Sequence, residues 1–397
     1  MENKKPPIPY ALKNLIVQHF RGIKDIRVEG LDRGTNWVFL TGRNGYGKTC
    51  LLQALFLGFW GKLDAEGVIL AEEVTTPFLI KLEGYAPSME KSFVHEVKSN
   101  TISGTFGASD MTPKVPVVAY GPSRLSLQAS ASKNEERQRS AVAYSLFNAD
   151  GVLLNIENEL KSWFFRSQSR ELSRDESRKM KGKYEAVKNA LIQLLPNIVE
   201  ITPDPRKDMI YYTELSEGNV PLAEKRTLEE IPSGSKSILA MIGYLIIRLF
   251  RTQPHITDPK ALEGIVLIDE LDLHLHPEWQ YELPSLLSSV FPKVQFIAST
   301  HSPIPLLGAP AQSAFFTVSR TKEEGITMKR LNIEIEKLTP NLILTSEVFG
   351  FYDIIAKSNA SSKRVHTEDT MQEKSFRDEL KRRLQVFEEQ GGKYEAE

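Results

Sequence analysis

The chain has 397 residues, which is long enough for one large domain with an insertion or for two domains. Its hydrophobic content of 41% and charged content of 25% are ordinary for a globular protein, and a net charge of −1 excludes a global field that would attract nucleic acid or membranes. The one cysteine, Cys50, excludes internal disulfides and indicates a reducing compartment. Without a signal-peptide core or a run of 18 uninterrupted apolar residues, we expect a cytoplasmic protein and no membrane partner.

The first region, residues 10–122, alternates short apolar runs with turns. The runs at 12–20, 37–41 and 115–120 predict strands, because each is short and bounded by turn residues. The longer apolar run at 49–60 predicts a buried helix. This order of elements indicates the first part of a mixed α/β domain.

The second region, residues 123–224, changes in texture and is predicted to be an insertion. Residues 126–139 are rich in Ser, Ala and charge and predict a surface loop, and residues 152–195 predict a helical hairpin that ends at Pro196. The middle of the hairpin, from Arg166 to Lys183, holds seven Lys or Arg and three Asp or Glu. Two interpretations stay open: a solvated helical face, or a patch that contacts nucleic-acid phosphates.

The third region, residues 225–355, returns to an α/β pattern. Residues 233–249 predict a helix with an apolar face, and the apolar runs at 264–268 and 294–299 predict central parallel strands. Such strands place active-site loops at their carboxyl ends. In the last region, residues 356–397, an amphipathic helix is expected over 366–390, either packed on its own domain or serving as a docking element.

A phosphate loop follows the predicted strand at 37–41. The residues Gly42, Arg43, Asn44, Gly45, Tyr46, Gly47, Lys48 and Thr49 fit the pattern G-x-x-x-x-G-K-[ST] completely. The glycines let the backbone present N–H groups to phosphates at a helix N-terminus. Lys48 is expected to reach the β- and γ-phosphates, and Thr49 to give its hydroxyl to Mg²⁺. We interpret Cys50, which follows directly, as a small packing residue beside the nucleotide rather than a nucleophile.

The predicted strand at 264–268 ends in two carboxylates, Asp269 and Glu270. Carboxylates at the end of a buried strand need a cation or a proton nearby. Asp269 is therefore predicted to bind Mg²⁺, and Glu270 to polarise the water that attacks the γ-phosphate. A solvated acidic turn is the alternative, and the phosphate loop disfavours it.

A histidine follows the next predicted strand. His301 comes directly after the run at 294–299, so it is expected at the same sheet edge as the acidic pair. There it can donate to the γ-phosphate and sense its loss. A purely structural histidine is the alternative.

These motifs together resemble the ABC-type ATPases of the SMC/RecF/OLD kind. Four segments carry the resemblance: Asn14-Leu15 with His-Phe-Arg-Gly-Ile at 19–23, the phosphate loop, Leu-Ile-Asp-Glu-Leu-Asp-Leu-His-Leu-His-Pro at 267–277, and Ser-Thr-His-Ser-Pro at 299–303. The third segment looks most like stand-alone ATPases of bacterial anti-phage systems, such as the Septu-type and OLD-like ones. The resemblance implies an ABC-type ATPase head with a mainly helical insertion and a C-terminal helix, and a homodimer that sandwiches ATP and Mg²⁺.

The resemblance also implies that a signature motif from the other subunit completes each ATP site. Ser233, Gly234, Ser235 and Lys236 stand where that motif belongs and open a predicted helix. A serine hydroxyl, a glycine N–H and a helix N-terminus suit a γ-phosphate. Ser235 and Lys236 depart from the common L-S-G-G-Q form, which indicates slow hydrolysis; an ordinary Ser helix cap is the alternative.

Five further residues are interpreted beside the resemblance. Arg21 matches a family position near the nucleotide, with a surface arginine as the alternative. Asp272 matches a loop that touches the partner's site. We interpret His274 and His276 as interface packing rather than as a metal site, since no cysteine or further histidine cluster lies near them. The family's glutamine loop is not identifiable, and Arg124 is a weak candidate near its expected place.

The sequence therefore predicts an ATPase that acts as a switch, with two interpretations of its output. In the first, it senses a trigger and controls a separate effector, a nuclease or toxin, in anti-phage defence. The chain after His301 shows no TOPRIM-like acidic cluster and no His-Asn-His pattern, which favours this interpretation. In the second, it clamps DNA in repair or recombination, although the insertion is too short for an SMC-length coiled coil. A transporter subunit is disfavoured by the His-Phe-Arg-Gly and Asp-Leu-His-Leu-His segments.

Overall fold

The computed structural model describes residues 7–61, 77–87, 92–99, 114–122, 127, 142–195, 197–216 and 220–331. The expected helix at 366–390, the candidate Arg124 and all but one residue of the loop expected at 126–139 lie outside these ranges. All of the described residues belong to the compact unit that ends at Gly350.

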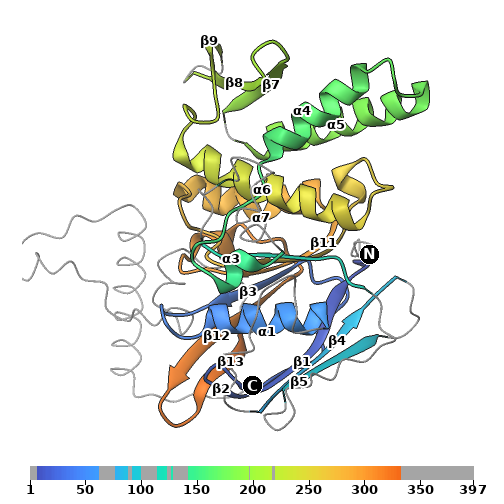
Figure 1. The fold of residues 1–397 in the computed structure, drawn as a ribbon. Coiled ribbons are helices and arrows are strands. Elements are labelled where there is room, and N and C mark those ends of the chain that lie inside the picture. Colours follow the sequence, from blue (N-terminus) through green and yellow to red (C-terminus); the bar gives the residue numbers. More distant parts are fainter. Residues whose placement is uncertain are drawn as a thin grey trace, which may run out of the picture. The chain divides into compact units, whose positions relative to one another are not determined.

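A large mixed sheet organises the described chain (Figure 1). Its ten strands are β1 (Ala11–Phe20), β2 (Ile23–Val28), β3 (Trp37–Thr41), β4 (Phe78–Tyr85), β5 (Phe93–Ser99), β6 (Val117–Tyr120), β10 (Glu263–Ile268), β11 (Lys293–Ser299), β12 (Ser313–Thr321) and β13 (Gly325–Leu331), in the order β5-β4-β1-β2-β13-β12-β3-β11-β10-β6. The strands from β12 to β6 run parallel to one another, and β1, β2, β4 and β5 form an antiparallel wing. The parallel half contains every strand predicted for the site.

Helices cover both faces of the parallel half, which explains its continuous apolar strands. Within β3, Trp37 and Phe39 enter one hydrophobic cluster, whereas Val38 and Leu40 enter the other, because successive side chains point to opposite faces. Helix α1 (Lys48–Trp60) packs in the second cluster. Helices α6 (Ser233–Thr252) and α7 (Pro277–Val290) pack in the first.

Helix α6 is apolar because it lies inside the protein. Among the described helices it alone is long and apolar enough to cross a membrane, and 78% of its apolar window is buried. One side packs toward β6 and β10, and the other toward the insertion. Its composition is thus accounted for by packing.

In the described part of the predicted insertion, α3 (Tyr144–Phe147) is followed by a hairpin of α4 (Ile156–Gln168) and α5 (Arg174–Leu194). The side chain of Asn155 caps α4, and Ser173 forms a capping box with Glu176 at the start of α5. Figure 1 shows the hairpin extending beyond α6. A three-stranded sheet follows, formed by β7 (Ile198–Asp204), β8 (Met209–Leu215) and β9 (Pro221–Arg226), and the sequence did not indicate it.

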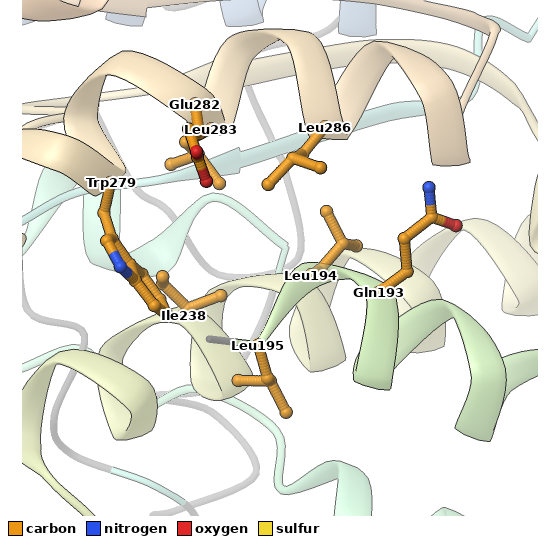
Figure 2. Close-up of a pocket in the computed structure, with 8 residues that line it drawn as sticks. All are labelled: Gln193, Leu194, Leu195, Ile238, Trp279, Glu282, Leu283 and Leu286. Carbon is orange, nitrogen blue, oxygen red and sulfur yellow. The ribbon is translucent and has the colours of Figure 1, made fainter. Parts of the chain in front are cut away.

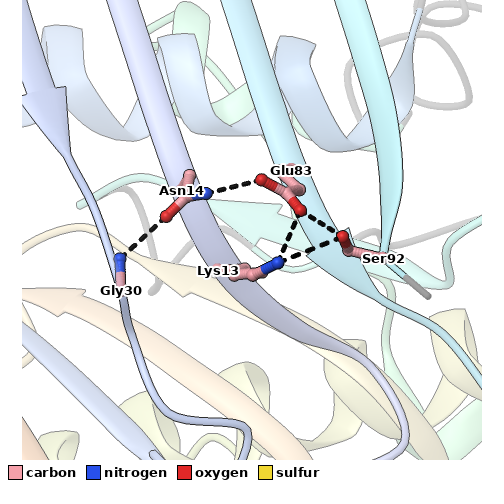
Figure 3. A network of polar contacts seen from close by, with 5 residues as sticks. All are labelled: Lys13, Asn14, Gly30, Glu83 and Ser92. Atoms are coloured by element: carbon pink, nitrogen blue, oxygen red, sulfur yellow. Dashed lines mark hydrogen bonds and ion pairs between the residues drawn. The ribbon is translucent and has the colours of Figure 1, made fainter.

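A polar network fixes the antiparallel wing (Figure 3). Lys13 Nζ lies 2.7 Å from Glu83 Oε1, and Asn14 Nδ2 donates to the other carboxylate oxygen at 2.5 Å. The side-chain Oδ1 of Asn14 accepts from the Gly30 backbone N–H at 2.7 Å. The register of β1 against β4 shifts at this point, so both Lys13 and Asn14 reach one carboxylate. The network ties β1 to β4 and to the loop after β2.

Candidate nucleotide-binding site

Three neighbouring parallel strands, β3, β11 and β10, end at one edge of the sheet and bring the predicted motifs together. β3 leads into the phosphate loop, β10 into Asp269, and β11 into His301. Ile268 of β10 pairs with Ala298 of β11, and Ser299 of β11 pairs with Leu40 of β3. The three loops that follow these strands therefore start side by side. Polar side chains from distant parts of the sequence therefore meet at the carboxyl ends, as parallel strands require.

The phosphate loop needs its glycines. Gly42, Gly45 and Gly47 have φ of 135°, 76° and 96°, a region that side chains rarely adopt. A Cβ on Gly42 would lie 2.2 Å from the Val318 carbonyl oxygen, and one on Gly47 would lie 2.3 Å from Ile326 Cδ1. The loop thus rests closely against β12 and β13. The side chains between these glycines, Arg43 and Asn44, are exposed, and Tyr46 is half-buried.

Lys48 lies at the centre of the site. Only 5% of it is exposed, and its Nζ donates to the carbonyls of Gly42 at 2.7 Å and Arg43 at 3.0 Å. The same Nζ lies 3.2 Å from His301 Nδ1. Burial lowers the pKa of Lys48 to about 8, although the carboxylates of Asp269, Glu270 and Asp272 oppose this shift.

Nucleotide affinity should therefore fall at alkaline pH. Phosphate oxygens favour protonated Lys48, and with its pKa about 8 the free protein loses that proton above this pH. By linkage, the Kd for Mg·ATP should rise by up to about tenfold per pH unit above that point, with proton uptake on binding. Titration with a fluorescent ATP analogue at several pH values, and calorimetry in buffers of different ionisation enthalpy, measure both. Lys48→Arg, which stays charged, should flatten the profile; an equal slope in this variant contradicts the assignment.

Thr49, Asp269 and Ser299 form the part of the site that suits a magnesium ion. Thr49 Oγ1 donates to Asp269 Oδ2 at 2.7 Å, and Ser299 Oγ donates to Asp269 Oδ1 at 2.5 Å. These are hard oxygen donors, and the described residues hold no cluster of three or more His, Cys, Asp or Glu. Mg²⁺ is commonly held by one or two protein oxygens together with substrate phosphates. The donor set fits this mode, in which Thr49 and Asp269 would hold the ion.

The substitution Ser299→Ala tests whether the buried hydroxyl of Ser299 holds Asp269 and Glu270 in place. Ser299 is fully buried, and its Oγ also accepts from the Glu270 N–H at 2.8 Å. The variant leaves that N–H and one Asp269 oxygen without this partner, so we expect about 1–3 kcal/mol less stability and a weaker Mg²⁺ dependence of ATP binding. Ser288→Ala is the matched control, because Ser288 is a buried serine bonded to Trp37 away from the site. Equal Mg²⁺ dependence of ATP binding in the two variants would show that Ser299 does not contribute to the magnesium site.

Glu270 and His301 follow the ends of the neighbouring strands β10 and β11. Glu270 has φ of 51°, an unusual conformation for a residue with a side chain, held by its N–H bond to Ser299. His301 is half-buried, and burial together with the charge of Lys48 lowers its pKa. A neutral imidazole can both donate and accept a hydrogen bond.

Asp272 connects the acidic strand end to the histidine loop within one chain. Its Oδ1 accepts from Thr300 Oγ1 at 2.5 Å and from the His301 N–H at 3.1 Å. The resemblance placed Asp272 at the partner's site, and the structure adds this contact inside the subunit. Any movement of the loop that carries Asp272 is thereby coupled to His301.

The signature candidates lie apart from the phosphate loop in the same chain. Ser233 is the exposed first residue of α6, Ser235 is buried, and Lys236 Nζ donates to the Glu229 carbonyl at 2.5 Å. A Cβ on Gly234 would lie 3.5 Å from the His274 carbonyl oxygen. Among the described residues, no bond joins 233–236 to the phosphate loop. Their placement is compatible with a role in a second subunit's site.

Arg21 bonds to helix α1, and Cys50 lies in the first turn of that helix. Arg21 Nη1 donates to Gln53 Oε1 at 2.6 Å, and Gln53 Nε2 donates to the Leu146 carbonyl at 2.9 Å. Cys50 packs against the second hydrophobic cluster, and burial raises the pKa of its thiol, which disfavours the thiolate. Arg21 thus belongs to a link between α1 and α3.

Sequence reasoning missed Ser299, Thr300 and Gln53. Ser299 and Thr300 stand inside the Ser-Thr-His-Ser-Pro segment and carried no separate signal. Their positions could have been inferred by aligning the ends of β10 and β11. Nothing in the sequence marked Gln53, because its partners come from residues distant in the chain.

The sequence has relatives among bacterial defence ATPases. Residues 122–305 match a family described as "AAA domain, putative AbiEii toxin, Type IV TA system". The Septu protein PtuA of Bacillus mycoides (strain KBAB4) is 28% identical over 363 residues, which cover 88% of this chain and 46% of that protein. The Retron Vc95 probable ATPase of Vibrio cholerae serotype O1 biovar El Tor is 29% identical over 246 residues, which cover 60% of this chain and 42% of that protein. The chain thus spans less than half the length of these relatives.

A solved SMC head, bound to the C-winged helix domain of ScpA, aligns with 83% of this chain and 98% of that chain at 14% identity and a TM-score of 0.46. The sheet order, the phosphate loop after β3 and the acidic strand end define this chain as an ABC-type P-loop ATPase head. In sequence the chain is similar to a Septu protein and to a retron ATPase, which are ATPases of anti-phage defence systems.

Proposed function

We propose that the protein binds Mg·ATP, hydrolyses it slowly, and uses the cycle as a switch. One observation carries this proposal: Lys48, Asp269, Glu270 and His301 meet at one sheet edge, joined by direct bonds or neighbouring backbone. Lys48 Nζ contacts His301, and Asp269 receives the Thr49 hydroxyl. A cation, a magnesium-binding pair, a carboxylate and a histidine are the groups that phosphoryl transfer to water needs.

Each residue has a separate task in this proposal. Lys48 exchanges its loop carbonyls for phosphate oxygens and neutralises their charge. Mg²⁺ would supply further charge neutralisation between the phosphates. Glu270 accepts a hydrogen bond from the attacking water and orients it, while neutral His301 donates to the γ-phosphate. Because Asp272 holds the His301 backbone, contact with phosphate is transmitted to the loop after β10.

We further propose that two copies sandwich the nucleotide, with Ser233 to Lys236 of one copy completing the site of the other. Ser233 is exposed at the N-terminus of α6, and the first turn of that helix has no acidic residue to compete with a phosphate. A phosphate held between two subunits favours the closed dimer, and its loss favours opening. This differential affinity is what a two-state switch requires.

The proposed output is control of a partner effector, a nuclease or toxin, in a cytoplasmic anti-phage system. The defence relatives support this output. Expression of the tagged chain with its neighbouring genes, followed by identification of what co-purifies, tests it. A stoichiometric nuclease or toxin released or activated in an ATP-dependent way supports the proposal. Recovery of the chain alone, fully active in ATP hydrolysis, contradicts it.

A DNA-clamping ATPase is the second candidate, and the hairpin tip favours it. Six basic residues are exposed there: Arg166, Arg170, Arg174, Arg178, Lys179 and Lys181. None of them makes an ion pair with another described residue. Unpaired basic side chains on a projecting hairpin suit the phosphates of nucleic acid.

The double variant Arg170→Glu/Arg174→Glu tests the second candidate. If the hairpin holds DNA, affinity for a duplex should fall at least about tenfold, and the slope of log K against log salt should become shallower. Fluorescence anisotropy over a salt series measures both. Lys24→Glu/Arg27→Glu, which reverses two exposed charges on β2, is the control. Equal losses in the two variants would mean that DNA binds without using the hairpin.

A further inference from the structure

A small apolar pocket lies where α5, α6 and α7 meet. It has a volume of about 150 Å³ and is lined by Gln193, Leu194, Leu195, Ile238, Trp279, Glu282, Leu283 and Leu286. Figure 2 shows Trp279, Leu283 and Leu286 of α7 facing Ile238 of α6 and Leu194 of α5. The floor is buried, whereas Trp279 and Leu286 are half-buried and Glu282 is exposed at the rim. The pocket is therefore open to a partner from the side of α7.

A second depression continues along the other side of α7. It has a volume of about 420 Å³, and its lining includes Tyr281, Leu307 and Ala309. Glu282 and Leu286 line both depressions, so the two form one surface on either flank of the helix. Tyr281 is 52% exposed, which is unusual for a large aromatic side chain. We call this surface, from Trp279 to Leu286 with Leu307 and Ala309, the α7 face.

Size and charge limit what the α7 face can hold. The pocket is smaller than typical sites for cofactors or metabolites but has room for one or two apolar side chains. Helix α7 carries Glu278 and Glu282, both exposed, and no Lys or Arg. Among the described residues, neither glutamate has an ion-pair partner. An apolar surface rimmed by unpaired carboxylates is complementary to a segment that carries apolar and basic residues.

The α7 face also adjoins the elements that the ATP cycle would move. Ile238 belongs to the first turns of α6, the helix that Ser233 begins. Trp279 lies in the first turn of α7, which follows the loop of Asp272 and His274. In that loop the His274 carbonyl oxygen lies close to Gly234. A ligand on this face therefore contacts both the signature helix and the helix after the acidic strand. Its affinity would depend on how these two helices are arranged.

We propose that the α7 face is the docking surface for a basic amphipathic segment of the effector protein. One or two apolar side chains enter the pocket between Trp279 and Leu286, and Lys or Arg side chains pair with Glu278 and Glu282. This inference rests on the proposed control of an effector, and it names the surface through which that control acts. A second copy of this chain is the competing occupant.

A designed peptide tests the chemistry of the face. The probe is a labelled helix of about 18 residues, or five turns, with Leu at i, i+3, i+4 and i+7 positions and Lys elsewhere, compared with a Leu/Glu version. Glu282→Lys and Leu286→Asp should each weaken binding of the Leu/Lys peptide at least about tenfold. Glu282→Lys should strengthen binding of the Leu/Glu peptide. Glu324→Lys, the same charge change on the exposed turn between β12 and β13, is the control.

Hydrolysis separates this inference from the proposed function. Glu282→Lys changes an exposed side chain and should keep ATP hydrolysis within about twofold of the unchanged protein, as surface substitutions usually do. Peptide affinity that is insensitive to Glu282→Lys and Leu286→Asp, in protein that still hydrolyses ATP, overturns the docking surface alone. Absence of hydrolysis in the unchanged protein overturns the proposed ATPase cycle instead.

Photo-crosslinking identifies the natural occupant. A benzoylphenylalanine at Tyr281, in the full chain co-expressed with its neighbouring genes, should crosslink to a segment of another protein that carries Lys or Arg beside apolar residues. Glu282→Lys should abolish this crosslink. Crosslinks to a second copy of this chain, or to an acidic segment, overturn the proposal.

Discussion

Lys48→Ala is expected to abolish nucleotide binding, with at least about a hundredfold loss of affinity for Mg·ATP. The buried ammonium group is the one described cation that bonds the carbonyls of its own phosphate loop. Removing it leaves the loop N–H groups to hold the phosphates without a compensating charge in a largely buried site. Calorimetric titration with Mg·ATP measures the loss, and no ATP-dependent dimer should form.

Lys293→Ala is the control for Lys48→Ala. Lys293 begins β11, at the opposite end of the strand from His301, and pairs with Glu263 at 3.2 Å. The substitution Lys293→Ala removes one positive charge from the same sheet without changing the phosphate loop. Unchanged affinity in Lys48→Ala, measured with a melting curve that shows a folded protein, would place the nucleotide somewhere other than the phosphate loop.

The elements around the site could be predicted from the sequence because their signals are local. The strand expected at 37–41 is β3, Trp37–Thr41, and the helix expected from residue 49 begins one residue earlier at Lys48. The runs at 264–268 and 294–299 are β10 and β11, each extended by one residue. Short apolar runs followed by glycine or acidic residues are enough to place strand ends. Parallel pairing of those strands then brings the loops together.

What the sequence could not predict depends on contacts between distant segments. The roles of Ser299 and Asp272 follow from the register of β10 against β11, which fixes the two loop starts to within a residue. The sheet of β7, β8 and β9 has short strands with many exposed positions, so its apolar periodicity is weak. The α7 face could not be predicted from the sequence either, because Leu194, Ile238 and Leu286 belong to three separate helices.

In the proposed switch, the His301 and Asp272 contacts would transmit the nucleotide state within one chain. Lys48 contacts the His301 ring, and Asp272 holds its backbone, so the phosphate loop and the loop after β10 share one connection. That second loop leads directly into α7 through His276 and Pro277. A shift at the γ-phosphate therefore has a short covalent and hydrogen-bonded route to the α7 face.

Glu270→Gln is expected to bind ATP but to lower hydrolysis by at least about a hundredfold, because the amide is a much weaker base than the carboxylate. The substitution keeps the side chain's size, and the backbone N–H bond to Ser299 remains available. With the γ-phosphate retained, the closed dimer should accumulate. Phosphate release measures hydrolysis, and sedimentation or light scattering with and without Mg·ATP measures the dimer.

Glu263→Gln is the matched control for Glu270→Gln, since Glu263 lies at the other end of the same strand, β10. It should hydrolyse ATP normally and show no ATP-stabilised dimer beyond that of the unchanged protein. Asp269→Asn should behave differently from both, because Asp269 receives the hydroxyls of Thr49 and Ser299 and is the proposed magnesium residue. Normal turnover in Glu270→Gln would remove Glu270 as the base. Loss of ATP binding in that variant would instead assign Glu270 to the metal, and the contrast with Asp269→Asn decides between the two roles.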